Sequence, residues 1–503
     1  MLGSVDSCVL VGLDARPIHV EADIGRGEVA FMLVGLAATT VKEARERVRS
    51  AIRNSGLEFP STRLTVNLAP AEMRKEGTGL DLPMAVAIAL ARAGKAAPSR
   101  SAFLGELALD GSVRHVDGVL VAVRGLQSLG YERVFVPAAD AAEAALVEAL
   151  EVIPCASLGA VVNHLLGVEP IPPAPPSPVH DVESCRIHEH DLTEVHGQEE
   201  AKRALEVAAA GGHHLLMSGP PGAGKTMLAR CLPGILPPLE LAEALEVAQV
   251  RSLLGELPRE GPLDWARPFR APHHGVSMAG LIGGGTGLAQ PGEISRAHHG
   301  VLFLDELAEF QTPVLQALRQ PLEAGRVSIT RSGGSVTYPA RFTLVAATNP
   351  CPCGWAGDGV RGCRCTPGAI DTYQRRLSGP LLDRIDLQVA VRRVQLEMLA
   401  SEARGEPSAT VRERVVAARR RQHERQGCLN AQLKPARLRQ LAGLAPASRR
   451  ALERWGAHRG ITARGFHRAW RVACTSADLD GSEQIEEHHI LEALGFRLQD
   501  VAA

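Results

Sequence analysis

Hydrophobic and polar positions alternate with different periods along the chain, and each change of period marks a change of predicted structure. Over residues 1–167, short runs rich in β-branched residues alternate with alanine-rich stretches that follow the helical period. The predicted strands are residues 7–13, 29–34, 63–68 and 133–136, and the predicted helices are residues 40–54, 82–93 and 139–150. This pattern predicts a separate α+β or α/β domain over residues 1–167.

A proline-dense segment follows this region. Residues 168–184 read VEPIPPAPPSPVHDVES and show neither the strand nor the helix period. Such composition favours an extended, semi-rigid conformation, so we predict a linker over residues 168–190. The alternative is a structured turn in which the proline segment docks on one of the flanking domains.

The middle of the chain contains three short, predominantly apolar runs, at residues 215–217, 301–304 and 342–348. Runs of this length are typical of strands that are buried on both faces of a parallel sheet. In such a sheet, ligands bind at the carboxyl edge of the strands. We therefore predict an α/β nucleotide-binding core over residues 191–393, with its site where these runs end.

The first run leads into the loop GPPGAGKT, and a helical segment follows the loop. Strand, glycine-rich loop and helix form the context that a phosphate-binding loop with the spacing G-x-x-x-x-G-K-[ST] requires. Lys225 is predicted to reach the β- and γ-phosphates of ATP, and the Thr226 hydroxyl to hold Mg²⁺. A chance glycine turn before a helix is the alternative. The residues predicted to bind the nucleotide are Gly219, Pro220, Pro221, Gly222, Ala223, Gly224, Lys225 and Thr226.

The other two runs end in the polar residues that ATP hydrolysis needs. Asp305 and Glu306 follow the run at 301–304, and Asn349 follows the run at 342–348. Asp305 is predicted to hold Mg²⁺, Glu306 to polarise the attacking water, and Asn349 to hydrogen-bond that water or the γ-phosphate. Arg384, in SGPLLDRID, is a candidate arginine finger for the nucleotide of a neighbouring subunit.

Two segments interrupt the predicted core. Residues 271–300 are rich in glycine, which predicts a mobile loop held at both ends rather than a rigid helix, with a disordered surface loop as the alternative. Residues 327–339 contain two β-branched runs around Ser-Gly-Gly, which predicts a β-hairpin. Arg331, near its tip, is predicted to contact phosphate groups of a nucleic acid, and a solvated arginine is the alternative.

Cysteines gather in one short stretch directly after Asn349. Cys351, Cys353, Cys363 and Cys365 form two C-x-C pairs, and four thiolates in one loop suit a tetrahedral Zn²⁺. The C-x-C spacing is tighter than the usual C-x₂-C spacing of zinc sites. Redox-active thiols or a disulfide-prone loop are therefore alternatives to structural zinc.

Composition and charge narrow the classes of partner. The chain has 503 residues, 45% of them hydrophobic, and a formal net charge of −1, so any nucleic-acid contact has to come from local patches. No run of about 18 apolar residues and no signal-peptide pattern occurs, which predicts a cytoplasmic protein without membrane contact. Ten cysteines, four of them clustered, suit reduced thiols better than a disulfide framework.

The order of the motifs GPPGAGKT, PGEISRAHHGVLFLDE, ATNPCPCG and LLDRID carries a family resemblance. The chain resembles the AAA+ ATPases related to the magnesium-chelatase ATPase subunit, and more closely the competence-associated ComM/YifB group. The resemblance implies a helix-2 insert at residues 271–300 and a pre-sensor-1 hairpin at residues 327–339, both facing the pore of a hexameric ring. It also implies a helical lid over residues 394–503, in which Arg464 matches the second sensor arginine.

The first domain is similar to the proteolytic domain of Lon-type proteases. At the position of the family's nucleophilic serine this chain has Gly79, and at the position of its lysine it has Leu120. Glycine cannot attack a carbonyl, and neighbouring Thr78 is the possible substitute nucleophile. An inactive, Lon-protease-like domain that serves as an assembly or partner surface is therefore expected.

The resemblance implies an ATP- and Mg²⁺-dependent homo-hexameric motor on single-stranded or branched DNA. Such helicases drive branch migration in homologous recombination during natural transformation, with recombination proteins as partners. One alternative is a chelatase-type motor for metal insertion into a porphyrin, although the resemblance to that subunit stops at the ATPase and the lid. An ATP-dependent peptidase is disfavoured by Gly79 and Leu120. A protein-remodelling ATPase stays open, because pore loops can grip polypeptide as well as DNA.

Overall fold

The structure is a computed structural model in which two compact units are distinguished. It describes the chain except for residues 36–38, 73–78, 177–189, 259–262, 286–288, 332–333, 378, 395–404, 442–443, 445, 460–462 and 498–503. Unit 1 comprises Met1–Asp181, Ala244–Asp264 and Thr330–Thr337, and unit 2 comprises Val182–Glu243, Trp265–Ile329 and Tyr338–Ala503. Among the described helices, none is long and apolar enough to cross a membrane.

Unit 1 is built on a seven-stranded mixed sheet with the strand order β3-β4-β2-β1-β5-β8-β9. Its strands alternate between buried apolar and more exposed positions, as in β4, where Leu64, Val66 and Leu68 are fully buried. The long hairpin of β1 and β2 pairs Val5 with Val20. The strands are β1 Leu2–Val11, β2 Asp14–Ile24, β3 Ala30–Val34, β4 Arg63–Ala69, β5 Ser101–Phe103, β8 Arg133–Pro137 and β9 Glu151–Cys155, with a small β6 Glu106–Leu107 and β7 Val113–Arg114 pair.

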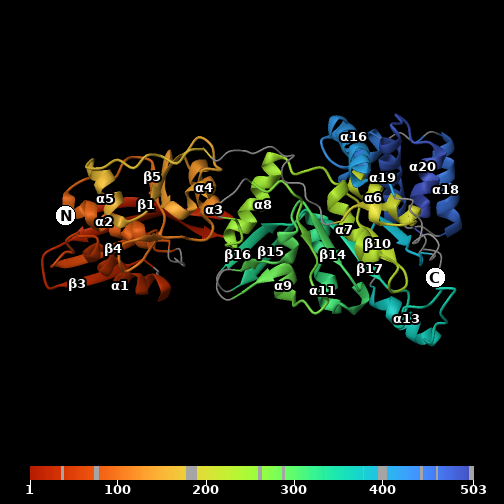
Figure 1. The fold of residues 1–503 in the computed structure, drawn as a ribbon, viewed down its shortest axis with the longest axis horizontal. Coiled ribbons are helices and arrows are strands. Elements are labelled where there is room, and N and C mark those ends of the chain that lie inside the picture. The colour runs from red at the N-terminus through yellow and green to blue at the C-terminus, as the bar shows by residue number, and fades with distance from the viewer. Residues whose placement is uncertain are drawn as a thin grey trace. The chain divides into compact units, whose positions relative to one another are not determined.

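Helices pack on this sheet, and α2 is buried along most of its length (Figure 1). They are α1 Thr39–Asn54, α2 Asp81–Ala93, α3 Val119–Ser128, α4 Ala141–Ala144 and α5 Leu158–Leu166. The predicted helix at residues 139–150 is wrong, because α4 has only four residues and the chain then turns toward β9. Ala149 adopts a positive φ of 59° in this turn, which a continuing helix does not permit. The alanine-rich composition therefore overstated the helix.

The described part of the predicted linker is held against unit 1. The backbone N–H of Ile171 donates to His164 Nδ1 at 2.8 Å, and the N–H of Ala174 donates to the carbonyl of Val152 at 2.8 Å. Residues 168–176 thus dock on unit 1. This is the alternative that the sequence left open beside an extended linker. Residues 177–189 of the predicted linker lie outside the described residues.

Unit 2 contains a five-stranded, all-parallel sheet with the order β11-β14-β17-β10-β18 (Figure 1). Leu215 of β10 pairs with Val345 of β17 on one side and with Leu387 of β18 on the other. The apolar runs at 215–217, 301–304 and 342–348 all form buried strands, so that prediction is confirmed. The strands are β10 Leu215–Ser218, β11 Phe269–Arg270, β14 Val301–Leu304, β17 Thr343–Thr348 and β18 Leu387–Ala390.

The two insertions of this core are folded and touch each other. Residues 271–300, predicted as a mobile loop, contain α9 Met278–Ile282, β12 Gly283–Gly284, β13 Gln290–Pro291 and α10 Glu293–Arg296. The predicted hairpin is confirmed as β15 Arg326–Arg331 and β16 Gly334–Pro339. The Tyr338 hydroxyl donates to the carbonyl of Ala289 at 2.5 Å. A Cβ at Gly283 would lie 2.4 Å from the carbonyl oxygen of Gln290, so only glycine allows this close pairing.

The C-terminal region is helical, as predicted, and it shares one hydrophobic core with the parallel sheet. Its helices are α16 Ser408–Gln426, α17 Pro435–Leu441, α18 Pro446–Arg459, α19 Ala463–Asp480 and α20 Glu487–Gly495. The other α-helices among the described residues are α6 Glu199–Gly211, α7 Lys225–Ile235, α8 Leu241–Leu253, α11 Thr312–Ala317, α12 Arg319–Ala324, α13 Pro367–Arg376 and α14 Gly379–Leu382.

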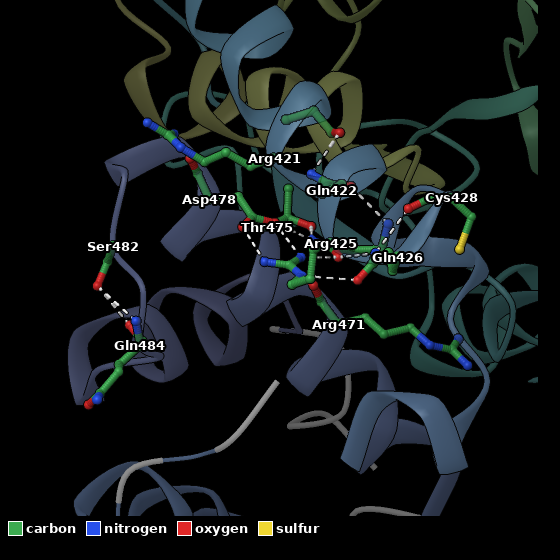
Figure 2. Close-up of polar contacts among 12 residues, drawn as sticks. Arg421, Gln422, Arg425, Gln426, Cys428, Arg471, Thr475, Asp478, Ser482 and Gln484 are labelled. Atoms are coloured by element: carbon green, nitrogen blue, oxygen red, sulfur yellow. Dashed lines mark hydrogen bonds and ion pairs between the residues drawn. The ribbon is translucent and has the colours of Figure 1, made fainter. Parts of the chain in front are cut away.

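An ion pair joins α16 to α19 in this lid. Arg425 donates to both carboxylate oxygens of Asp478, at 2.7 and 2.9 Å, and Asp478 is only 2% exposed (Figure 2). Asn430 donates to Asp478 at 2.8 Å and to the Thr475 hydroxyl at 3.0 Å. The buried carboxylate is therefore fully provided with donors, as a buried charge requires.

We expect Asp478→Asn to loosen the packing of α16 on α19. Losing hydrogen bonds to a buried charge should cost about 2 kcal/mol, equivalent to roughly thirtyfold faster amide hydrogen exchange in both helices. Glu424→Gln is the control, because Glu424 pairs with Arg420 on the same helix at 3.0 Å while both side chains are more than half exposed. That exposed pair should contribute less than about 1 kcal/mol. Equal exchange rates in the two variants would contradict this role of Asp478.

Candidate nucleotide site

The predicted phosphate-binding loop joins the carboxyl end of β10 to the first turn of α7. Gly224 precedes the helix in a left-handed conformation with φ 93°, and Gly222 has φ 76°. Positive φ values at these positions favour glycine and let successive backbone N–H groups turn toward one point. The amino-terminal end of α7 adds its positive dipole at the same place. The loop can therefore cradle a phosphate.

Two neighbouring segments approach this loop closely. A Cβ at Gly219 would lie 2.0 Å from the carbonyl oxygen of Val391, just after β18, so only glycine fits there. A Cβ at Gly354, in the cysteine loop, would lie 2.6 Å from Cδ of Pro221. The cysteine loop thus packs directly on the phosphate-binding loop, a contact that the sequence did not indicate.

Lys225 is buried at the centre of the site. Its ammonium group donates to the carbonyls of Gly219 at 2.6 Å and Pro220 at 3.0 Å, and to Asn349 Oδ1 at 3.2 Å. Burial lowers the pKa of Lys225, and the charges of Asp305 and Glu306 act in the opposite direction. Lys225 and Asn349 are therefore brought together as the predicted phosphate ligand and sensor require.

The predicted Mg²⁺ ligands also meet. The Thr226 hydroxyl donates to Asp305 Oδ2 at 2.8 Å, although the two residues lie 79 positions apart. A hydroxyl and a carboxylate are oxygen ligands of the kind that Mg²⁺ takes beside nucleotide phosphates. The arrangement fits an ATP·Mg²⁺ complex held by Lys225, Thr226 and Asp305.

Glu306 follows Asp305 at the end of β14 and has an unusual backbone conformation. Its φ of 50° and ψ of 48° lie in the left-handed region, which is rare for a residue with a side chain. Its carboxylate lies 3.3 Å from His274 Nδ1. His274 was not predicted as a functional residue. Its position in APHHG, at the start of the predicted insert, was the only signal in the sequence.

The two other predicted catalytic residues are Arg384 and Arg464. They differ in their contacts and in their exposure. Arg384 donates to Glu323 of the same chain at 2.5 Å, and its side chain is 15% exposed. Arg464 is exposed in the first turn of α19. Arg384 is predicted to contact the nucleotide of a neighbouring subunit, and Arg464 to contact the γ-phosphate from the lid. Both roles stay predictions.

Two residues after Arg384, Asp386 forms a buried link to the lid. Asp386 Oδ2 lies 3.0 Å from His213 Nδ1, and His213 Nε2 lies 2.8 Å from the Thr475 hydroxyl on α19. Burial alone would raise the pKa of Asp386, but the hydrogen bond with His213 and the charges of His213 and Arg468 lower it to about 2. The ionised carboxylate therefore ties α19 to the strand that carries the phosphate-binding loop. Sequence analysis did not single out His213, Asp386 or Thr475.

The four predicted zinc ligands converge in space. The Sγ atoms of Cys351 and Cys353 are 3.4 Å apart, and Cys363 Sγ lies 3.7 and 3.6 Å from them. All four Sγ atoms, including that of Cys365, lie within 4.8 Å of one another. Backbone N–H groups of Arg364 and Trp355 lower the pKa of the Cys353 thiol to about 6. The pKa of Cys363 is raised to about 12 and that of Cys365 is also raised, so the low pKa of Cys353 favours one thiolate in the cluster, the form that binds metals.

A second group of metal-binding side chains, Asp480, His488 and His489 at the end of the lid, does not suit a metal. His489 Nδ1 accepts the backbone N–H of Glu486 at 3.0 Å, so the proton of the neutral ring is on Nε2. That Nε2 lies 3.3 Å from Asp480 Oδ2. A protonated ring nitrogen cannot coordinate a metal, so His489 caps the start of α20 instead.

Arg331, the predicted nucleic-acid contact, is exposed at the end of β15. Val327 and Ile329 of the same strand are buried, so the outward positions of the hairpin alternate with them. An exposed arginine at this place is available to a partner. The geometry of the hairpin as predicted is confirmed, whereas the contact stays a prediction.

A parallel sheet with a phosphate-binding loop after β10, paired Asp and Glu after β14 and a helical lid defines a nucleotide-binding α/β ATPase of the AAA+ class. Family comparison agrees with this class. Residues 191–399 match "Magnesium chelatase, subunit ChlI", residues 405–497 match its C-terminal region, and residues 20–140 match "Subunit ChlI of Mg-chelatase". The chain belongs to this magnesium-chelatase ChlI-like family, whose members are ATPases that use ATP and Mg²⁺.

Full-length relatives refine the comparison. The chain is 44% identical to the competence protein ComM of Haemophilus influenzae over 503 residues, covering 99% of this chain and 97% of that protein. It is 43% identical to the protein YifB of Escherichia coli over 504 residues, with the same coverage. The magnesium-chelatase 38 kDa subunit of Cereibacter sphaeroides is 28% identical over 176 residues, covering 31% of this chain and 51% of that protein. The similarity to ComM and YifB therefore extends through both units.

We expect Gly219→Ala to displace the phosphate-binding loop, because its Cβ would collide with the backbone of Val391. Overpacking of this kind typically costs about 1–3 kcal/mol of unfolding free energy, measurable by urea unfolding. Gly362→Ala is the matched control, since a Cβ at Gly362 would meet no atom within 4 Å. An unchanged unfolding free energy in Gly219→Ala would show that the close approach to Val391 does not constrain the loop.

Proposed function

We propose that the chain is an ATP-driven motor on single-stranded or branched DNA, which acts in homologous recombination during natural transformation. The observation that carries the proposal is the convergence of Lys225, Thr226, Asp305 and Asn349 at one edge of a parallel sheet. The full-length similarity to a protein named for competence supports the DNA substrate. A cytoplasmic location and recombination proteins as partners belong to the same proposal.

Each side chain of the site has a distinct role in hydrolysis. Lys225 neutralises the β- and γ-phosphates, while Thr226 and Asp305 hold Mg²⁺. Glu306 orients and polarises the attacking water, and Asn349, already hydrogen-bonded to Lys225, senses the γ-phosphate. The ammonium group of Lys225 donates to the loop carbonyls of Gly219 and Pro220. Phosphate oxygens would replace those carbonyls, which keeps the buried ammonium group paired.

Assembly into a homo-hexameric ring would complete the site. Arg384 would then stabilise transition-state charge on the nucleotide of the adjacent subunit, and Arg464 would contact the γ-phosphate from the lid. Arg384 has to exchange its partner Glu323 for phosphate to do so. Because Glu323 is 60% exposed, its carboxylate can be solvated when the arginine leaves.

DNA would be held by a small number of phosphate contacts. With a net charge of −1, the surface as a whole does not attract DNA, so a local group such as Arg331 has to provide the attraction. A contact to phosphate carries no sequence information, which suits a motor that moves along any strand. The N-terminal domain, similar to Lon-type proteases but with Gly79 and Leu120 at the dyad positions, would provide an assembly or partner surface.

ATP turnover with and without forked DNA tests this function. We expect DNA to stimulate turnover, Glu306→Gln to bind ATP without hydrolysing it, and Arg331→Ala to keep basal turnover while losing most of the stimulation. The salt dependence of DNA binding should become shallower by roughly one unit of log–log slope for each phosphate that the variant no longer neutralises. The control is Arg326→Ala, which removes an exposed arginine from the opposite end of β15.

Contradictory results would point to other substrates. If unfolded protein stimulates turnover and DNA does not, the chain is a protein-remodelling ATPase. If neither does, a chelatase-type motor becomes the better explanation. Equal losses in Arg331→Ala and Arg326→Ala would remove the special role of the hairpin tip.

The cysteine cluster is proposed to hold one structural Zn²⁺. With Zn–S bonds of about 2.3 Å, tetrahedral geometry places sulfur atoms about 3.8 Å apart, close to the observed 3.4–3.7 Å between Cys351, Cys353 and Cys363. A disulfide would need an S–S distance of about 2.05 Å. The N–H of Ala356 donates to Cys351 Sγ at 3.4 Å, a supporting contact typical of metal sites.

Metal analysis of the purified protein should find about one zinc per chain. The double substitution Cys351→Ser with Cys363→Ser should remove it, because two thiolates cannot close the site. Cys428→Ser should leave the zinc content unchanged, since Cys428 lies outside the cluster. A metal-free protein that is folded and hydrolyses ATP at the parent rate would overturn the proposal.

A further inference from the structure

The cysteine loop, residues 351–366, has an open tip. A Cβ at Gly357, Gly359 or Gly362 would meet no atom within 4 Å, so the tip stands clear of neighbouring segments. Val360 at this tip is 74% exposed, more than any other large hydrophobic side chain among the described residues. Figure 1 shows that α13, which follows the loop, lies at the margin of unit 2. The tip is therefore accessible to a partner.

The tip carries positive charge. Arg361 and Arg364 are exposed, and no acidic residue occurs from position 359 to position 370. In the described part of the chain, no ion pair joins either guanidinium group to a carboxylate. The acid just before the tip, Asp358, has a side chain that is only 1% exposed, and its Oδ1 lies 3.7 Å from Arg393 Nε, which offsets its charge. In a chain with a net charge of −1, this is a local patch of the kind that attracts a polyanion.

An indole ring holds the Arg361 side chain in place. The guanidinium carbon of Arg361 lies 4.6 Å from the centroid of the Trp355 ring, and that of Arg393 lies 5.3 Å from it. The backbone N–H of Arg361 donates to Asp358 Oδ2 at 3.0 Å. Cation–π contact leaves the N–H groups at the edge of the guanidinium available for an anion. Because the side chain is already ordered, Arg361 loses less conformational entropy when it binds a phosphate.

The base of the cysteine loop is fixed. Its four Sγ atoms lie within 4.8 Å of one another. Arg364 lies between Cys363 and Cys365, and the N–H of Cys365 donates to Cys363 Sγ at 3.4 Å. At the start of the loop, Gly354 packs on Pro221 of the phosphate-binding loop. The tip is thus presented by a loop that also touches the nucleotide site.

We propose that the tip of the cysteine loop binds single-stranded DNA, with Arg361 and Arg364 on backbone phosphates and Val360 against a base. Guanidinium groups suit phosphates, with which they form paired hydrogen bonds. An aliphatic side chain between them suits a base, whose face is accessible in a single strand and stacked in a duplex. The inference rests on the proposed function, because it takes DNA as the ligand, and it adds a contact outside the hairpin that carries Arg331.

The experiment measures the binding of a labelled single-stranded oligothymidine to the full-length protein by fluorescence anisotropy. Thymine is chosen because its methyl group offers an apolar contact. The variants are the double substitution Arg361→Ala with Arg364→Ala, the same pair changed to lysine, and Val360→Ser. Lysine keeps the charge but lacks the planar guanidinium that the indole holds. An abasic strand of the same length separates contacts with bases from contacts with phosphates.

The matched control is Arg375→Ala with Arg376→Ala. It removes the same number of exposed cations from α13, where Arg375 lies 2.8 Å from Asp371 and Arg376 lies 4.0 Å from Glu309. Carboxylates already offset the charge of these two arginines. Circular dichroism, gel filtration and zinc analysis of every variant show whether the fold, the assembly and the metal content are those of the parent.

In the alanine double variant of the tip we expect the dissociation constant to rise roughly ten- to thirtyfold at about 0.1 M salt. The log–log salt slope should become shallower by roughly 1.4 units, because each phosphate of a single strand contributes about 0.7. The lysine variant should keep the slope and lose part of the affinity. Val360→Ser should weaken oligothymidine binding roughly three- to fivefold and leave binding of the abasic strand unchanged. The control on α13 should bind as the parent does.

Several results would overturn the inference. Equal weakening in the alanine variant of the tip and in the control would mean that the strand responds only to general surface charge. Altered assembly in the alanine variant would assign the tip to a contact between copies of the chain. If that variant is misfolded, the lysine variant and Val360→Ser decide, and parent-like affinity in both excludes the contact. A parent that binds forked DNA but no single strand excludes the tip alone, whereas a parent that binds neither contradicts the proposed function as well.

Discussion

The site depends on one constraint, the parallel direction of β14, β17, β10 and β18. Because the strands run in the same direction and are hydrogen-bonded in register, the residues that follow them emerge at one edge of the sheet. β17 lies between β14 and β10, which places Asn349 between the Asp305 carboxylate and the phosphate-binding loop. The contacts of Lys225 with Asn349 and of Thr226 with Asp305 are consequences of this order. An antiparallel strand at either position would move its catalytic residue to the opposite edge.

A buried polar link extends this constraint to the lid. Ionised Asp386, His213 and the Thr475 hydroxyl form a continuous contact through the core, where an unpaired charge would be costly. Gly211 leaves the space for it, since a Cβ there would lie 2.3 Å from His213 Nε2 and 2.5 Å from Thr475 Oγ1. The lid is thereby connected to the strand leading into the phosphate-binding loop. The loop before β18, which carries Arg384 and ends at Asp386, is in contact with α19 through His213.

Other loops pack against the phosphate-binding loop and the end of β14. The cysteine loop touches Pro221 through Gly354, so a metal that stiffens the cysteines would also support the phosphate-binding loop. On the other side, the insert contacts the hairpin through Tyr338 and Ala289, and His274 contacts Glu306. The insert is therefore in contact both with the hairpin and, through His274, with the residue proposed to activate water.

The sequence alone determined the local elements whose signals are short-range. Apolar runs ending in GPPGAGKT, in Asp305 and Glu306, and in Asn349 predicted buried strands correctly, because β-strand burial and loop glycines depend on neighbouring residues. The alanine-rich run at 139–150 failed because the turn toward β9 overrode helix propensity. Only the tertiary structure decided the contacts of His274 with Glu306, of Asp386 with His213, and of Arg384 with Glu323. These pairs join residues far apart in the chain, and their distances follow from strand order and loop packing, which no local pattern encodes.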